Sequence, residues 1–381
     1  MIKIKSDKII TENGLFNGFV YILNDKISSV SKDDFDSEFN YDYTGKYVSP
    51  GFIDIHTHGA GGYSFSNSSC EDVIKACEFH LKHGTTSILP TISSSPFCEI
   101  KFSVENIASA VKSKKCKSNI IGAHIEGPYF SLNQCGAQYP DYITEPIKED
   151  YESLITDFGK YIKRWSYAPE RDFNAEFCRF LNINGIIASA GHSDAKYKDM
   201  TLAIDNGLNL VTHLYSCTST VTRDKGYRSL GVVETAFLRD ELFVEVIADG
   251  KHMPPELINM IIKIKGTDKV ALVTDSMEIA GTNNVEGVCC GTEYIVEDGV
   301  CKLKDRSAFA GSVATADRLI RVLINDCGKD LITAVKMITK VPSDILNLNK
   351  GIISTGRDAD IIVFDDDINI SNAFVGGVKV I

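Results

Sequence analysis

Long apolar runs and basic clusters are both missing from this chain. No stretch approaches the ~18–20 apolar residues of a membrane-spanning helix. Residues 1–10 alternate charged residues with isoleucine and lack the apolar core of a signal peptide. Forty Lys+Arg against 51 Asp+Glu give a net charge of −11, and no basic run exceeds Lys114-Lys115. We therefore expect neither a nucleic-acid partner nor membrane association.

Paired-cysteine motifs are missing as well. The 11 cysteines are scattered without any Cys-x-x-Cys spacing, and the only close pair is Cys289-Cys290. In a large chain without a leader, this pattern indicates reduced thiols and a cytoplasmic location. The apolar share of 44% is that of a folded globular protein, and 381 residues predict one large domain with a smaller one.

Six of the eight histidines end or closely follow short apolar runs, and these runs predict the fold. The runs are almost continuously apolar, as expected for parallel strands covered on both faces. Between them lie stretches long enough for helices, such as 70–83, where apolar residues recur at helical spacing and Gly84 follows. Eight strand–helix units are the number in a (β/α)8 TIM barrel. The expected strands are 53–58, 85–92, 120–127, 164–170, 186–192, 210–215, 243–250 and 269–276.

The two ends of the chain have a different pattern. Residues 1–49 and 350–381 contain short strand-like segments separated by turn residues. We expect them to form one small β-sandwich domain beside a catalytic barrel of residues 50–349. The fold class is therefore α/β. The expected strands of the sandwich include 18–23, 26–30, 361–364 and 375–380.

Polar residues gather where the predicted barrel strands end, which is where a TIM barrel forms its active site. His56 and His58 are two residues apart on one strand, so both imidazoles face the same side and can reach one metal ion. Glu126, His192 and His213 end three further strands. Each of these alone is typical of a buried structural residue. Two histidines with a carboxylate leave room for water, so the combination favours a catalytic metal site.

Asp275 closes the last predicted barrel strand. A carboxylate there can bind a metal, act as a general base toward water, or do both. The alternative is an N-cap for a following helix. A divalent metal lowers the pKa of bound water and polarises a carbonyl group. These residues predict hydrolysis of an amide or a similar C–N bond, with Asp275 passing the proton of water to the leaving amine.

The motifs around these residues together resemble the amidohydrolase superfamily and, within it, the N-acetylglucosamine-6-phosphate deacetylase family. Many superfamily members use a carboxylated lysine at the end of strand four; segment 164–170 has none there, and Glu126 takes its place. The resemblance covers essentially the whole chain. It implies a metal-dependent hydrolase barrel that releases acetate from N-acetylglucosamine 6-phosphate. The motifs are His-Ile-Glu-Gly-Pro, Gly-His-Ser-Asp-Ala, Thr-His-Leu-Tyr, Ala-Asp-Gly-Lys-His and Val-Thr-Asp-Ser.

The resemblance also implies one or two divalent ions per subunit. Glu126, His192 and His213 would hold the main ion. His56 and His58, with Glu126 and with Asp275 as a further candidate ligand, would hold the second. Asp275 would be the catalytic acid/base. We expect zinc first and leave iron, manganese and cobalt open, because histidine and carboxylate suit all four. The implied metal ligands are His56, His58, Glu126, His192, His213 and Asp275.

Substrate contacts follow from the resemblance alone. His252 would help to bind the sugar phosphate, and Gln138 would lie against the sugar. Family members are homodimers in which an arginine of the neighbouring subunit holds the phosphate; Arg228 matches it better than Arg223. The implied substrate-binding residues are Gln138, Ser216, Cys217, Arg228, His252, Phe309, Ala310 and Gly311.

One loop departs from the family pattern. Where relatives have Asn-Ala-Met after the strand-six motif, this chain has Ser216-Cys217-Thr218, and the stretch from His213 to Arg228 is several residues longer. The loop contributes to phosphate binding, so the alternative is the same chemistry on another N-acyl amino sugar, such as N-acetylgalactosamine 6-phosphate. A non-catalytic, amidohydrolase-like scaffold is a third interpretation, which the retained ligand set disfavours.

Overall fold

The computed structural model describes residues 1–381, and its central feature is a ring of parallel strands. Their order follows the chain, and the short strand β10 (Asn119–Ile120) also pairs with β9. All eight segments expected as barrel strands overlap one of these strands. They are β6 (Phe52–Thr57), β9 (Thr85–Ile92), β11 (Ala123–Glu126), β12 (Ile162–Tyr167), β13 (Ile187–Ala190), β14 (Leu210–Val211), β17 (Phe243–Ile247) and β18 (Val270–Val273).

The first and last strands of this series meet at their C-terminal ends. The backbone N–H of Asp275 donates to His56 O at 2.9 Å, and that of His58 donates to Ser276 O at 2.8 Å. Beside them, Thr274 Oγ1 donates to the Asp54 carboxylate at 2.5 Å. The strands thereby form a nearly closed barrel, and the predicted (β/α)8 fold class is confirmed.

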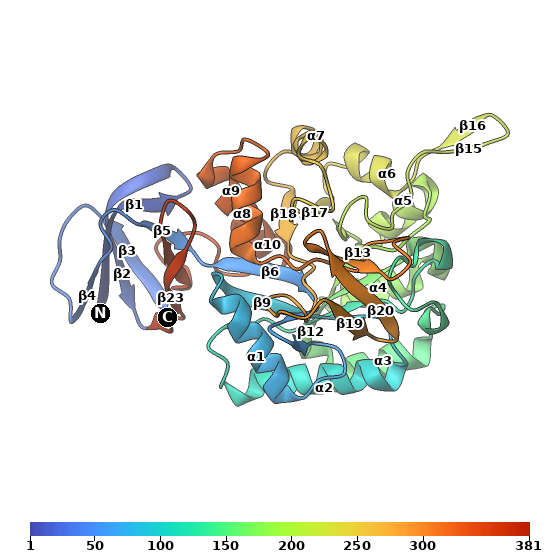
Figure 1. The fold of residues 1–381 in the computed structure, drawn as a ribbon, viewed down its shortest axis with the longest axis horizontal. Helices are drawn as coiled ribbons and strands as arrows, with labels where there is room; N and C mark the ends of the chain where they lie inside the picture. Colours follow the sequence, from blue (N-terminus) through green and yellow to red (C-terminus); the bar gives the residue numbers. More distant parts are fainter.

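Helices cover the outside of the barrel (Figure 1). In α1, the Ser69 side chain accepts the backbone N–H of Asp72 and starts the helix, whose residues Val73, Cys77 and Leu81 are buried toward the strands. The helices are α1 (Cys70–Leu81), α2 (Phe97–Ser113), α3 (Lys148–Phe158), α4 (Glu176–Ile183), α5 (Tyr197–Asp205), α6 (Val232–Leu238), α7 (Pro255–Lys265), α8 (Ala316–Asn325), α9 (Leu331–Ile338) and α10 (Lys340–Ile345). None of them is both long and apolar enough to cross a membrane.

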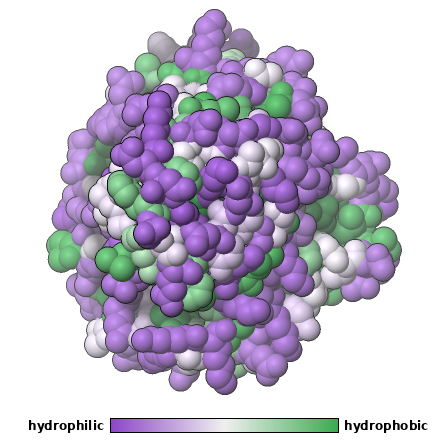
Figure 2. All heavy atoms as spheres, turned by 90° about the vertical axis from the view of Figure 1, so that its left-hand side faces the viewer, coloured by the Kyte–Doolittle hydropathy of each residue, from purple (hydrophilic) through white to green (hydrophobic).

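Both chain ends join in a second, eight-stranded sheet at the left of Figure 1. Its centre is the antiparallel pair of β5 with β22, and side chains of its strands form most of a separate apolar cluster. The face seen in Figure 2 is largely hydrophilic, with small scattered hydrophobic groups. The strands are β1 (Ile2–Thr11), β2 (Gly14–Leu23), β3 (Lys26–Ser31), β4 (Phe39–Asp42), β5 (Tyr47–Pro50), β22 (Ile361–Phe364), β23 (Ile370–Val375) and β24 (Val378–Lys379).

One of the expected strands in this region is wrong. Residues 375–380 do not form a continuous strand, because Gly376 and Gly377 both have positive φ and make the turn between β23 and β24. The division of the chain into 1–49 with 350–381, and 50–349, stays a prediction.

Three small antiparallel sheets were not expected from the sequence. A three-stranded sheet of β19 (Glu286–Cys289), β20 (Thr292–Glu297) and β21 (Val300–Leu303) is inserted between β18 and α8. A hairpin of β15 (Thr222–Asp224) and β16 (Tyr227–Ser229) projects away from the barrel (Figure 1). The third is the pair β7 (Gly59–Ala60) and β8 (Tyr63–Ser64).

Candidate active site

The six predicted metal ligands all lie at the C-terminal mouth of the barrel. His56 and Glu126 belong to the ends of β6 and β11, and the other four follow their strands within two residues. His192, His213 and Asp275 have positive φ values of 46°, 25° and 48°. This conformation is strained for residues other than glycine and persists where surrounding contacts hold it, commonly at functional sites. For Asp275, the alternative of a helix N-cap is not what the structure shows, because no helix starts behind it.

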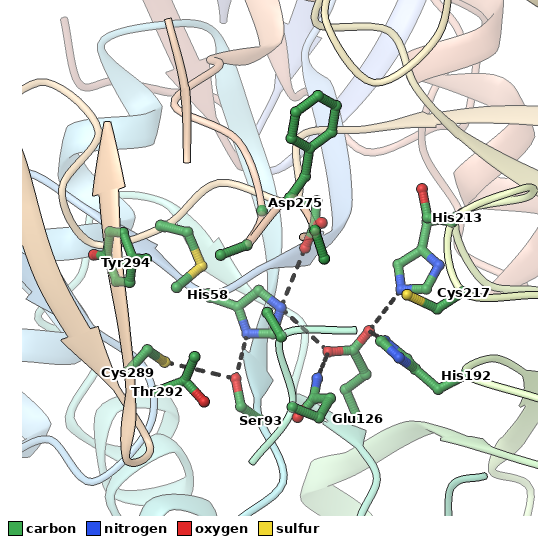
Figure 3. A pocket seen from close by; sticks show the side chains of 18 of the residues that line it. His58, Ser93, Glu126, His192, His213, Cys217, Asp275, Cys289, Thr292 and Tyr294 are labelled. Atoms are coloured by element: carbon green, nitrogen blue, oxygen red, sulfur yellow. Dashed lines mark hydrogen bonds and ion pairs between the residues drawn. The ribbon is translucent and has the colours of Figure 1, made fainter. Parts of the chain in front are cut away.

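Glu126 is the centre of the cluster (Figure 3). Its Oε1 lies 3.0 Å from His213 Nε2 and 3.5 Å from His192 Nε2. The same oxygen is 3.3 Å from His56 Nε2, and its Oε2 is 3.3 Å from His58 Nε2. The ligand atoms form two sets of three, and within each set all atoms lie within 4.8 Å of one another. One set is His56, His58 and Glu126, and the other is Glu126, His192 and His213. One carboxylate can therefore be shared by two ion positions.

Asp275 completes the cluster from the side of β18. Its Oδ1 lies 3.4 Å from His56 Nε2 and 3.2 Å from His58 Nε2. The structure thus brings together all six side chains that the sequence singled out, and all are buried. The donors are imidazole nitrogens and carboxylate oxygens, and His56 Nε2 is fully buried without a hydrogen-bond partner. Such a donor set, with a nitrogen left free at its centre, fits a divalent cation.

The electrostatics of the cluster favour positive charge. Burial lowers the pKa of His56 and His58, but the carboxylates of Glu126 and Asp275 raise these pKa values to about 9 and about 10. Burial in turn raises the pKa of Asp275, and the two histidines bring it down to about 2. Asp275 is therefore ionised near neutral pH, as a general base must be.

The outward-facing nitrogen of three histidine rings has its own partner. His58 Nδ1 lies 2.9 Å from Ser93 Oγ, and His192 Nδ1 lies 2.9 Å from the backbone oxygen of Gln134. His56 Nδ1 lies 3.2 Å from the carboxylate of Glu245. These contacts hold the rings so that Nε2 faces Glu126, the arrangement typical of histidines that bind metal.

A cavity of about 300 Å³ opens above the cluster. This volume is at the lower end of the ~300–1,000 Å³ found for small-molecule sites. His252, whose Nδ1 lies 2.9 Å from Asp249 Oδ2, is in its wall. Gln138 also lines it, but its Nε2 donates to Glu126 Oε2 at 2.8 Å. The other expected contacts in the wall are Ser216, Cys217, Phe309, Ala310 and Gly311.

Arg228 is the expected contact that the structure does not bring to this cavity. It lies exposed on β16, in the projecting hairpin. Sequence reasoning missed one wall of the cavity, which the β19–β21 sheet supplies; Cys290-Gly291 between strand-like segments was the available hairpin signal. The missed wall residues from this sheet are Cys289, Cys290, Thr292 and Tyr294.

A buried cluster of histidines and carboxylates at the mouth of a (β/α)8 barrel defines a metal-dependent hydrolase. The model of the amidohydrolase family matches residues 47–380, and the chain belongs to this family. Its superfamily is metal-dependent, in agreement with the ligand groups at the mouth.

Several similar proteins are deacetylases of phosphorylated amino sugars. The N-acetylglucosamine-6-phosphate deacetylase of Lysinibacillus sphaericus is 31% identical over 88% of this chain and 85% of its own. The N-acetylgalactosamine-6-phosphate deacetylase of Shewanella sp. (strain ANA-3) is 28% identical, covering 97% of this chain and 93% of its own. The crystal structure of N-acetylglucosamine-6-phosphate deacetylase from Pasteurella multocida superposes with a TM-score of 0.92 at 28% identity, over 99% of each chain.

Proposed function

We propose that this protein hydrolyses the N-acetyl group of N-acetylglucosamine 6-phosphate to give glucosamine 6-phosphate and acetate. One observation carries the proposal: five of the six metal-ligand candidates and seven of the eight expected substrate contacts line one cavity, and the sixth ligand candidate, His56, contacts Glu126 in its wall. A non-catalytic scaffold would have no need for this intact set.

The chemistry follows from the positions of the side chains. A divalent ion, when bound, polarises the acetyl carbonyl and acidifies a water molecule. Asp275 accepts the proton of the attacking water as the new C–O bond forms at the acetyl carbon. It then returns that proton to the sugar nitrogen while the C–N bond breaks, so the amine leaves neutral. His252, held by Asp249, faces the cavity as a donor for the sugar phosphate.

We also propose that one or two ions are held by the six ligands at the mouth, with zinc expected first. Metal analysis of protein purified without added metal, followed by titration of the chelated protein with Zn²⁺, Fe²⁺, Mn²⁺ and Co²⁺, tests the identity and the number of ions.

The phosphate site is proposed to be completed by a second copy of the chain. Arg228 is exposed on a hairpin that projects from the barrel, and its neighbour Tyr227 is 81% exposed. A guanidinium binds phosphate through two parallel hydrogen bonds. In a homodimer of cytoplasmic subunits, Arg228 would reach the site of the neighbouring subunit. Light scattering after size exclusion tests the dimer.

The galacto epimer is the second candidate substrate. It is favoured by the Ser216-Cys217-Thr218 segment, of which the first two residues line the cavity, and by the galactosamine-specific name of the Shewanella relative. The gluco substrate remains the proposal, because the more identical Lysinibacillus relative carries that name.

The test is acetate release from the two phosphorylated epimers and from unphosphorylated N-acetylglucosamine, on protein of measured metal content. A kcat/KM highest for N-acetylglucosamine 6-phosphate supports the proposal. A higher kcat/KM for the galacto epimer transfers the same chemistry to that substrate. Metal-loaded protein that releases acetate from none of the three contradicts the proposed function.

A further inference from the structure

We infer that Glu245 is a positioning residue, which fixes the His56 ring so that Nε2 faces the second ion position beside Glu126 and Asp275. The inference rests on the proposed two-ion site. It assigns a function to a buried pair, Glu245 with Arg164, that lies beneath the mouth and does not line the cavity.

Glu245 connects both halves of the ligand cluster. It lies in β17 with no exposed surface, and its Oε2 is 3.2 Å from His56 Nδ1. The same oxygen accepts the backbone N–H of His213 at 3.1 Å. A buried carboxylate is costly unless its oxygens are hydrogen-bonded, so its position between two ligand residues is well determined.

Arg164 holds this carboxylate from the opposite side. The guanidinium, from β12, is also without exposed surface; it donates to both oxygens of Glu245, to Oε2 at 3.0 Å. Further donations to Ile55 O at 3.2 Å, Thr212 Oγ1 at 2.9 Å and Ser189 Oγ at 3.1 Å anchor the guanidinium to β6, to the residue after β14 and to β13. A planar fork fixed at this many points prevents rotation of the carboxylate.

The consequence for the neutral His56 ring, which is the form that binds a metal ion, is a single tautomer. Every other group on Glu245 is a donor, so its carboxylate acts as an acceptor and Nδ1 of His56 carries the hydrogen. Nε2 then keeps its lone pair. That nitrogen has no hydrogen-bond partner and lies 3.3 Å from Glu126 Oε1 and 3.4 Å from Asp275 Oδ1. A carboxylate behind a histidine also makes the ring a stronger metal ligand.

The competing explanation is that the Arg164–Glu245 pair only braces the barrel interior. The two explanations differ for Glu245→Gln, which keeps the size of the side chain and removes its charge. As a positioning residue, Glu245 predicts a Zn²⁺ affinity about 10- to 100-fold weaker at the second position only. If the pair has only a structural role, E245Q should lower the melting temperature and leave the Zn²⁺ affinities of both positions unchanged.

The test titrates chelated wild-type and E245Q protein with Zn²⁺ and counts bound ions at equilibrium. Wild type is expected to bind two ions, and E245Q to bind one with unchanged affinity and the other about 10- to 100-fold more weakly. Ser189→Ala is the matched control, since it removes a contact of Arg164 without touching His56. The effect of E245Q should disappear in a His56→Asn background, because coupling through one residue is not additive.

Metal-free protein with ¹⁵N-labelled histidine gives a second measurement, which does not depend on ion binding. Above its pKa of about 9, where the ring is neutral, His56, assigned through its loss in H56N, should be the Nδ1–H tautomer in wild type and a mixture in E245Q. A single wild-type ion, equal affinities in E245Q, loss of both ions, or an unchanged tautomer each overturns the inference. Acetate release is not used here, so failure of the proposed substrate remains distinguishable.

Discussion

The mouth of the barrel and the β15–β16 hairpin differ in how their charged side chains are held. At the mouth, Glu126 and Asp275 are buried among four histidines, and the outer nitrogens of three of them also have partners. On the hairpin, Arg228 and its cross-strand neighbour Arg223 are both exposed. One chain alone therefore preorganises the groups for hydrolysis, whereas the proposed contact of Arg228 with phosphate requires a second chain.

The largest effect is expected from Glu126→Gln. The substitution removes the only side chain common to both ligand sets. Ion binding and acetate release should both be abolished, while the fold remains, because the amide has the same shape as the carboxylate. Metal analysis and circular dichroism measure the two results. A variant that keeps its ions and turns over would show that the mouth is less dependent on Glu126 than its geometry indicates.

Asp275→Asn should reduce kcat by roughly 10²- to 10⁴-fold, the usual contribution of a general acid/base. Asparagine retains an oxygen near His56 and His58 but cannot accept a proton. We expect at least one ion to remain bound, since His192, His213 and Glu126 are untouched. Single-turnover acetate release on protein of measured metal content checks the result. A kcat within threefold of wild type would exclude Asp275 as the proton carrier.

Arg228→Ala should act on KM rather than on kcat. Loss of a charge-assisted phosphate contact corresponds to a roughly 10- to 100-fold higher KM. Arg223→Ala is the matched control, since the two residues are directly paired across the hairpin. Mixing R228A with D275N subunits tests directly which subunit Arg228 serves. If it serves the neighbouring subunit, the mixed dimer regains one intact site and activity recovers. No recovery in subunit exchange, or an equal effect of R223A, contradicts the shared site.

The predictable part of the fold is the part that repeats. Segments 85–92 and 361–364 have the bounds of β9 and β22, because each is a continuous apolar run between turn residues. Segment 210–215 is much longer than β14 (Leu210–Val211), because the chain leaves the extended conformation at His213, where φ is positive. That turn is what aims the ring into the mouth, and apolar patterning does not record it.

The candidate site also has a part that the sequence predicts and a part that it does not. Its six ligand candidates follow strand ends, which parallel topology brings to one edge, so local motifs were enough to find them. Arg164 and Glu245 are 81 positions apart, and each occurs in an apolar strand without a motif. Their pairing depends on the tilt and register of β12 and β17, which a single sequence does not specify. The cavity wall formed by β19–β21 was not predicted for a related reason, because this sheet is an insertion outside the repeating strand–helix unit.

The smallest effect is expected from a substitution in a charge cluster away from the mouth. It tests whether charged side chains there stabilise the fold without contributing to catalysis. Asp317, at the start of α8, lies 3.2 Å from His83 Nδ1 and accepts from Arg321 at 2.6 Å. Burial raises its pKa, but His83 and neighbouring donors lower it to about 2. Asp317→Asn should therefore lower the free energy of unfolding by about 1–2 kcal/mol at pH 7 without changing kcat.

The pH dependence follows from the direction of this shift. Because the folded pKa lies below the ordinary value of 3.8, the ionised carboxylate stabilises the fold at every pH above that value. The contribution is lost as the pH falls through about 2, so the difference between wild type and D317N should narrow as the pH falls from about 4 to about 2. Urea unfolding at several pH values measures it. A loss of kcat in D317N at pH 7 would mean that this outer cluster supports the active site. The residues at the start of α8 would then contribute to catalysis as well as to stability.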